Sequence, residues 1–195
     1  DIPFRTVVRQ QYDYSCGSAA LATLLHYHYN MPVTEAEVFK AMYAKGDQEK
    51  IRKVGFSLLD IKNYLAARGF EADGYKLTFD QLVKINRPAI AVVTAGAYRH
   101  FVVVKGARNG KVLIGDPAGG LRNAEFSQIW NGVIFAIHAS SAAKVPYNRD
   151  EEWSPWALAP LGQPLGDASL SSFTRELPPI YQISTMINGN SPTTP

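Results

Sequence analysis

The chain contains a single cysteine, Cys16, directly before a run of small and apolar side chains at residues 18–25. A thiolate is the reactive form of cysteine, and the free N–H groups at the start of a helix stabilise an anion. Because the run is typical of a buried helix, we expect the thiol at a helix N-terminus, where it could act as a nucleophile. A lone cysteine cannot form an intramolecular disulfide, so packing in the core is the alternative use.

Two residues that could serve a thiol nucleophile lie near the ends of two predicted strands. His100 stands at the mouth of a β-branched run, and Asp116, fixed by Pro117, ends the strand predicted at residues 111–116. Asn109-Gly110 between the strands is a type I′ hairpin signal. Both residues fall toward the open end of that hairpin with a stagger of a few positions, so we expect a direct hydrogen bond between them.

A cysteine, a histidine and an aspartate brought together by the fold can form a nucleophilic triad. The thiol attacks, the imidazole moves the proton, and the carboxylate orients the ring and stabilises the imidazolium. Gln10 lies six residues before Cys16, in the segment that leads into the predicted helix. Its side-chain amide could donate a hydrogen bond to an oxyanion together with the backbone N–H of Cys16. Alone, His100 and Asp116 are also ordinary turn residues.

The order and spacing of these residues resemble the motif of the papain-like bacteriocin-processing peptidases, or double-glycine leader peptidases. That motif is a Gln, five intervening residues and Cys-Gly, then a His and an Asp-Pro, matched here by Gln10, Cys16-Gly17, His100 and Asp116-Pro117. The matched segment is 3–139. The resemblance implies a cysteine peptidase that cuts after Gly-Gly at the end of an amphipathic leader, with these residues as its catalytic groups. Its mechanism requires no metal or organic cofactor.

Members of that family usually form the N-terminal domain of an ABC exporter, and this chain departs from the pattern. Its longest apolar stretches have about ten residues, against the ~20 needed to cross a bilayer. It has no phosphate-binding P-loop motif. We therefore expect a stand-alone member without a transmembrane segment. The start at Asp1 rather than methionine fits either a trimmed chain or a mature protein whose signal peptide has been removed. Stand-alone members of the family that carry a signal peptide act in the periplasm, so we expect a periplasmic protein. One stand-alone subgroup accompanies operons that export bacterial functional amyloid.

Charge and composition limit the classes of partner. The formal net charge is +3 without a block of Lys and Arg, which is too weak and dispersed to indicate nucleic acid or an anionic membrane surface as a partner, so we expect no nucleic acid. The expected partner is a peptide or protein substrate with a Gly-Gly site, and the resemblance adds secretion or export components. A chain of 195 residues with 46% hydrophobic residues can build a proper globular core.

Helix signals fill the first half of the chain and strand patterns follow. Capping residues Thr34, Ser57 and Thr78 predict helix starts, and the polar segment 45–55 is expected to be a mobile loop. From residue 89 onward the period changes to that of an antiparallel sheet. We expect an α+β fold of the papain-like type, in which N-terminal helices pack on a C-terminal antiparallel sheet.

The composition changes again after residue 140. We therefore predict a papain-like peptidase domain at 1–140 and an extended, Pro- and Ser-rich segment at 141–195 whose last residues are disordered. The middle of that segment is too apolar for a solvated tail, so it should pack along the domain or bind a partner.

The remaining histidines and an internal Gly-Gly pair are interpreted as structural. His26 and His28 point to different faces of one helix, so they should be surface or boundary residues rather than a metal pair. His138 closes the last strand with no carboxylate nearby in sequence. Gly119-Gly120 copies the family's cleavage signature, but it lacks a helical leader and is expected to be a tight turn.

Two other classes of function remain open at this point. A thiol acyltransferase would use the same Cys, His and Asp but pass the acyl group to an amine. A catalytically silent module would bind leaders and act as an export adaptor, although such modules typically lack the cysteine that this chain keeps.

Overall fold

The structure is a computed structural model that describes residues 4–11, 14–95, 98–124, 129–138 and 145–154. Its helices are α1 (Cys16–His28), α2 (Glu35–Lys45), α3 (Gln48–Val54), α4 (Leu58–Ala66), α5 (Phe79–Lys84) and α6 (Asp150–Trp153). Its strands are β1 (Ala72–Lys76), β2 (Ala89–Ala95), β3 (Tyr98–Arg108), β4 (Lys111–Asp116), β5 (Gly120–Ala124) and β6 (Trp130–Ile137).

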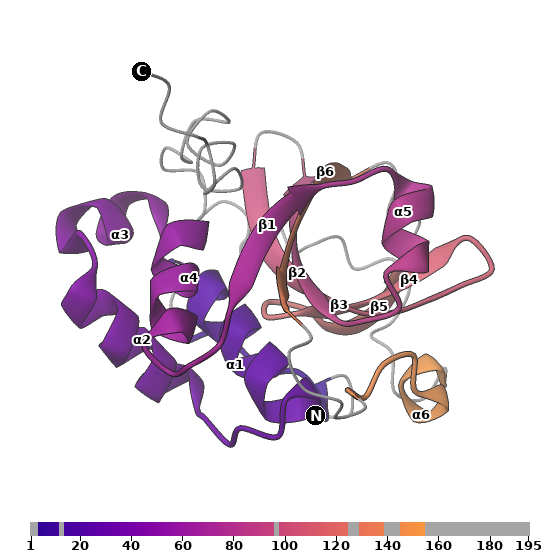
Figure 1. The fold of residues 1–195 in the computed structure, drawn as a ribbon, viewed down its shortest axis with the longest axis horizontal. Helices are drawn as coiled ribbons and strands as arrows, with labels where there is room; N and C mark the ends of the chain where they lie inside the picture. The colour runs from indigo at the N-terminus through magenta and orange to yellow at the C-terminus, as the bar shows by residue number, and fades with distance from the viewer. Residues whose placement is uncertain (1–3, 12–13, 96–97, 125–128, 139–144, 155–195) are drawn as a thin grey trace.

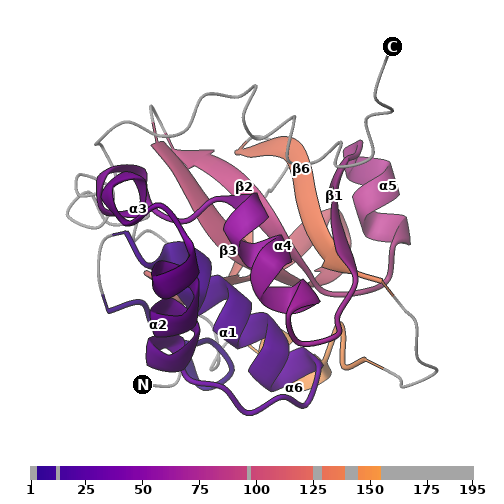
Figure 2. The same cartoon turned by 60° about the vertical axis from the view of Figure 1, so that its left-hand side comes forward.

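The strands form one six-stranded sheet in the order β1-β6-β2-β3-β4-β5, and every pairing is antiparallel. Helices α1 to α4 gather on one side of this sheet, and α5 lies at the other side of the molecule (Figure 1). The view turned by 60° shows α1, α2 and α4 side by side in front of the strands (Figure 2). The α+β fold with N-terminal helices packed on an antiparallel sheet is therefore confirmed.

The sheet is buried on both faces because its strands alternate two sets of apolar side chains. In β2, Ile90 and Val92 belong to the larger core, which the helices share. Ala89, Ala91 and Val93 belong to a second core on the opposite face, which Leu82 of α5 helps to close. The helices and the sheet are thus fixed to each other by a continuous layer of packed side chains.

Three helices begin where the capping residues predict. Thr34, Ser57 and Thr78 are the N-caps of α2, α4 and α5, and each takes part in a capping box. In each box the hydroxyl accepts a bond from the N3 backbone N–H, while the N3 side chain accepts one from the N-cap N–H. These local signals need no tertiary context, which explains why the sequence reveals them.

The prediction of a mobile loop at residues 45–55 is wrong, because α3 lies there. Asp47 caps this helix by accepting a hydrogen bond from Lys50 N–H at 3.1 Å, and Ile51 is buried in the main core. A single apolar residue among charged ones gives little helical periodicity, so the sequence pattern does not reveal this helix. Strands β1 and β5 were also not predicted, since Asp73-Gly74 and Arg122-Asn123 are weak strand formers.

The part of the C-terminal segment that the structure describes, residues 145–154, contains α6 and returns to the sheet. Asn148 N–H donates to Lys105 O at 2.8 Å, which ties this segment to β3. The domain division at residue 140 stays a prediction, and the segment from residue 155 onward lies outside the described residues. Among the described residues, no helix has the length and apolarity that a membrane span requires.

Candidate active site

Cys16 is the first residue of α1, and Ser15 is its N-cap. The backbone N–H at such a position has no acceptor within the helix. The side chain of Cys16 is largely buried, with 7% of its surface exposed. Gly17 allows Phe56 to pack closely against the start of α1, because a Cβ at position 17 would lie 3.0 Å from Phe56 Cβ. The predicted location of the thiol at a helix N-terminus is confirmed.

His100 and Asp116 form a buried pair at the open end of the β3–β4 hairpin. His100 Nε2 lies 2.7 Å from Asp116 Oδ1, and each side chain is 1% exposed. Asn109 and Gly110 at the opposite end have φ of +52° and +75°, as a type I′ turn requires. The same carboxylate oxygen accepts a hydrogen bond from Ala118 N–H at 2.8 Å, so the turn after Pro117 holds it in place. The expected hydrogen bond is confirmed.

The environment of His100 favours the protonated ring. Burial alone lowers the pKa of His100, but the charge and hydrogen bond of Asp116 outweigh it, with further contributions from a hydrogen bond and the charge of Cys16. The net result raises the pKa of His100 to about 10. Since Asp116 occupies Nε2, Nδ1 is the ring nitrogen left for the thiol. The side chains of Cys16, His100 and Asp116 therefore form one hydrogen-bonded group.

Gln10 lies beside the turn that carries Asp116. Its backbone N–H donates to Pro117 O at 3.0 Å. The residue is half-buried, and its side-chain oxygen is shielded from solvent. The described contacts thus bring Cys16, His100 and Asp116 together through their side chains and Gln10 through its backbone.

A buried carboxyl group that was not identified from the sequence lies near the start of α1, where Cys16 is located. Glu35, 3% exposed, has Oε1 at 3.1 Å from Ser18 Oγ and a further hydrogen bond with the Ser15 side chain. Burial raises the pKa of Glu35, which favours a neutral group close to the N-terminus of α1. In the sequence, Glu35 is merely the first residue after a helix cap, and such residues are normally solvated. No local pattern could have revealed that α2 packs this residue against α1.

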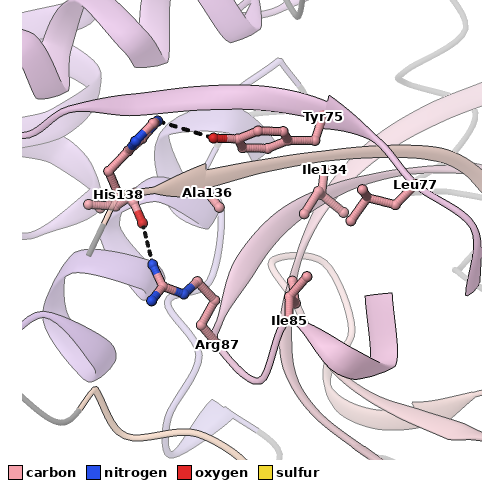
Figure 3. A pocket seen from close by; sticks show the side chains of 8 residues that line it. Tyr75, Leu77, Ile85, Arg87, Ile134, Ala136 and His138 are labelled. Atoms are coloured by element: carbon pink, nitrogen blue, oxygen red, sulfur yellow. Dashed lines mark hydrogen bonds between the residues drawn. The ribbon is translucent and has the colours of Figure 1, made fainter. Parts of the chain in front are cut away.

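His138 lies away from His100 and Asp116, and its partners come from another strand. His138 Nε2 lies 2.6 Å from Asp73 Oδ2 and 3.2 Å from Tyr75 Oη, both on β1. Figure 3 shows Tyr75 and His138 at one end of an apolar pocket, with Arg87 close by. None of Cys16, His100, Asp116 and Gln10 lines this pocket. The carboxylate that His138 lacks in sequence is thus supplied across the β1–β6 pairing.

The prediction that His28 is a surface or boundary residue is wrong. His28 is 3% exposed, and its ring bonds to Lys105 Nζ at 3.0 Å and to Pro146 O at 2.6 Å. The sequence could not show this, because both partners lie far along the chain. Within the described ranges, no group of three or more His, Cys, Asp or Glu side chains is placed to hold a metal ion.

Comparison with protein families gives one match over most of the chain. A family model described as the peptidase C39 family matches residues 5–142. Among curated proteins, the "Probable functional amyloid protease FapD" of Pseudomonas fluorescens is 38% identical over 175 residues, which cover 87% of this chain and 77% of that protein. The protein of the same name from Pseudomonas aeruginosa is 41% identical over 69% of this chain and 61% of its own length.

Solved structures agree with this match. A double glycine motif protease from an AMS/PCAT transporter, crystallised with its leader peptide, has a TM-score of 0.57 at 27% identity and covers 67% of this chain and 89% of its own. The peptidase domain of Streptococcus ComA, a bifunctional ABC transporter, has a TM-score of 0.58 at 26% identity and covers 68% of this chain and 96% of its own.

Proposed function

The chain belongs to the peptidase C39 family and is a cysteine peptidase, and from this premise we propose that it hydrolyses a peptide bond after a Gly-Gly pair. The proposal assigns Cys16 as nucleophile, His100 as general base and acid, Asp116 as the orienting carboxylate and Gln10 as an oxyanion donor. The observation that supports it most strongly is the buried His100–Asp116 pair at 2.7 Å, which also hydrogen-bonds the Cys16 side chain.

In the proposed first step, the Cys16 thiolate attacks the carbonyl carbon of the scissile bond while His100 carries the thiol proton. His100 then gives this proton to the amine that leaves, and a thioester forms between Cys16 and the N-terminal part of the substrate. Water attacks the thioester next, with His100 taking one of its protons and returning it to the Cys16 sulfur. The net reaction consumes one water molecule and regenerates the free enzyme.

The charge that develops on the carbonyl oxygen needs donors that are already in place. The backbone N–H of Cys16 is one candidate, because the first residue of a helix has no intrahelical acceptor. The Gln10 amide is the second, since its segment is tied to Pro117 and so lies next to the carboxylate that orients His100. Throughout both steps, Asp116 keeps the ring oriented and stabilises the imidazolium.

The proposed substrate is an exported protein or leader peptide with a Gly-Gly site. The support comes from the relatives: one solved structure is that of a double glycine motif protease in complex with a leader peptide. Two curated relatives carry the name functional amyloid protease. We propose accordingly that this protein processes a component of a functional-amyloid export system in the periplasm, where it would meet secretion partners.

The test is mass spectrometry of a Gly-Gly leader peptide and of candidate amyloid-system proteins, incubated with the parent protein or with Cys16→Ala. We expect cleavage after Gly-Gly by the parent protein and none by the variant. Cleavage that survives Cys16→Ala contradicts the assignment of the nucleophile. A product joined to an added labelled amine, in excess of the hydrolysed peptide, would favour an acyltransferase, and binding without any cleavage would favour an adaptor.

Reactivity of the thiol gives a test that needs no substrate. If His100 stabilises the thiolate, Cys16 should react with iodoacetamide at pH 6 faster than a free thiol does. Asp116→Asn should slow this reaction, because it weakens the charge that stabilises the imidazolium. A rate at pH 6 equal to that of a free thiol contradicts the activated nucleophile.

A further inference from the structure

Lys105 is a fully buried cation five residues after His100 on β3. It lies at a β-bulge, where the register of β3 against β4 shifts between Val104 and Gly106. A bulge turns a side chain away from the regular alternation of the strand. Its ammonium group therefore points to neither of the two apolar cores but to a set of polar partners.

Three acceptors surround this ammonium, which has three N–H donors. They are Thr6 O at 2.9 Å, His28 Nε2 at 3.0 Å and Glu152 Oε1 at 3.0 Å. Burial and the charge of Lys105 lower the pKa of His28 to about 3, so its ring is neutral and can accept at Nε2. Its Nδ1–H then donates to Pro146 O at 2.6 Å. The buried charge is thus satisfied by groups from the N-terminal segment, α1 and the segment 145–154.

The segment 145–154, which we call the brace, also contacts β3 through a second set of hydrogen bonds. Arg108 bonds to Asn148 Oδ1 at 3.1 Å and to Asp150 Oδ1 at 2.6 Å. The indole N–H of Trp153 donates to the same Asn148 oxygen at 2.7 Å. Gly106 makes this approach feasible, because a Cβ there would lie 2.6 Å from Asn148 Oδ1. The position of the brace is therefore fixed by β3 at and next to the bulge.

The brace in turn supports the N-terminal segment that leads to Gln10. Trp153 of the brace and Phe4 pack in one small core with Val7 and Leu113. Further along, Val8 N–H donates to Thr23 Oγ1 of α1 at 2.9 Å. Lys105 thus holds the N-terminal segment at Thr6, and the hydrogen bond from Gln10 N–H to Pro117 O holds it at its other end.

We propose that the brace supports the N-terminal segment through two positioning residues, Lys105 and Glu152, which hold this segment so that Gln10 meets the oxyanion. The proposal rests on the proposed function, because it uses the role given there to Gln10. It also goes beyond the family match, which covers residues 5–142 and so ends before the brace.

The buried ion pair between Lys105 and Glu152 should be sensitive to the removal of either charge. Glu152 is 1% exposed, and it is the only carboxylate among the three acceptors described for Lys105. Removing one member of a buried ion pair leaves the other charge without compensation, whereas removing both is far less costly. A variant without the carboxylate should therefore loosen Thr6 and the residues that follow it, while a variant without both charges should recover.

The test compares Glu152→Gln with Glu151→Gln, whose side chain is 65% exposed. With a Gly-Gly peptide substrate, Glu152→Gln should lower kcat by about 10- to 100-fold, the size of effect that a small misplacement of a catalytic group produces. KM should change little, and the Glu151→Gln control should match the parent. In a Gln10→Ala background, Glu152→Gln should have almost no further effect on kcat, because its action passes through Gln10.

Two results would overturn the proposal. One is a loss of kcat on Glu152→Gln that is equally large with and without Gln10, which would mean a general loss of structure. The other comes from hydrogen exchange, which needs no activity: Glu152→Gln should speed exchange at residues 4–10 more than in α2. Thermal unfolding adds a second measurement without activity. The midpoint that Lys105→Met lowers should be restored when Lys105→Met is combined with Glu152→Gln. Unchanged exchange at residues 4–10 rejects the brace. Absence of peptidase activity in the parent protein rejects only the proposed function and leaves the exchange test valid.

Discussion

His100 Nε2 and Asp116 Oδ1 lie 2.7 Å apart, although no backbone pairing joins the two residues. The last pair between their strands at this end is Val103 with Gly115, and His100 is paired instead with Val93 of β2. The ring reaches the carboxylate because Asp116 is held by Ala118 N–H at 2.8 Å in the turn that follows β4. The pair is therefore positioned by a turn and a sheet together.

Asp116→Asn should lower kcat with little change in KM. The amide keeps the shape of the side chain, but it has no charge to stabilise the His100 imidazolium. It can also favour the wrong tautomer of the His100 ring. The loss expected for such a change is about 10²- to 10⁴-fold. Steady-state kinetics on a Gly-Gly peptide measure it, with Asp80→Asn, an exposed carboxylate in the first turn of α5, as the control. An unchanged kcat for Asp116→Asn would remove this residue from the mechanism.

The stability of the protein should fall as pH rises through the alkaline range. The pKa of His100 is about 10 in the folded protein and near 6.5 in an unfolded chain. The folded state thus binds more protons between these values, so the contribution of the His100–Asp116 pair is complete below pH 6.5 and is lost by about pH 10.

Urea unfolding of Cys16→Ala and of Cys16→Ala/Asp116→Asn between pH 6 and 10.5 measures this contribution, and the thiol is absent from both proteins. Their difference removes the effects of other groups, such as Lys105, whose pKa burial lowers to about 8. The difference in the free energy of unfolding should shrink as pH rises. A difference independent of pH would contradict a protonated His100.

Gln10→Ala should reduce kcat by about 10²- to 10³-fold, the usual effect of removing one oxyanion donor. The backbone bond from Gln10 to Pro117 does not depend on the side chain, so the fold and KM should be retained. Gln11→Ala is the matched control, because this neighbouring glutamine is exposed. Equal kinetics for Gln10→Ala and Gln11→Ala would show that the oxyanion is bound elsewhere.

Gly17→Ala should destabilise the protein, although alanine is normally the better helix former. The new Cβ would lie 3.0 Å from Phe56 Cβ and 3.6 Å from Phe101 Cδ2. Overpacking of a well-filled core costs about 1–3 kcal/mol. Thermal or urea unfolding measures the loss, and the same change in a Phe56→Ala background should cost less. Equal losses in both backgrounds would mean that the contact with Phe56 is not the cause.

Much of the fold and of the candidate site could be predicted from sequence, because the signals are local. Capping residues Thr34, Ser57 and Thr78 mark helix starts, and Asn109-Gly110 fixes the hairpin that brings His100 toward Asp116. The order Gln, Cys-Gly, His and Asp-Pro gave the family. Each of these features depends on neighbours within a few positions.

The parts that could not be predicted depend on contacts between distant residues. Helix α3 exists because Ile51 enters a core built by other elements. Glu35, His28 and Lys105 become buried polar groups only when their elements are packed together, and residue type alone suggests that each would be solvated. The brace was missed for the same reason, since its support is the bulge in β3.

The location of Cys16 and His100 in different halves of the chain has a consequence for timing. The proposed nucleophile, Cys16, leaves the ribosome first, and its proposed base lies 84 residues further along. Until the β3–β4 hairpin has formed and packed on α1, Cys16 lacks its proposed base. In the folded protein, Gly119 lies in the turn after Pro117, and Gly120 is paired with Asp116. The fold that brings the proposed triad together therefore also places the chain's own Gly-Gly pair in a turn and a paired strand.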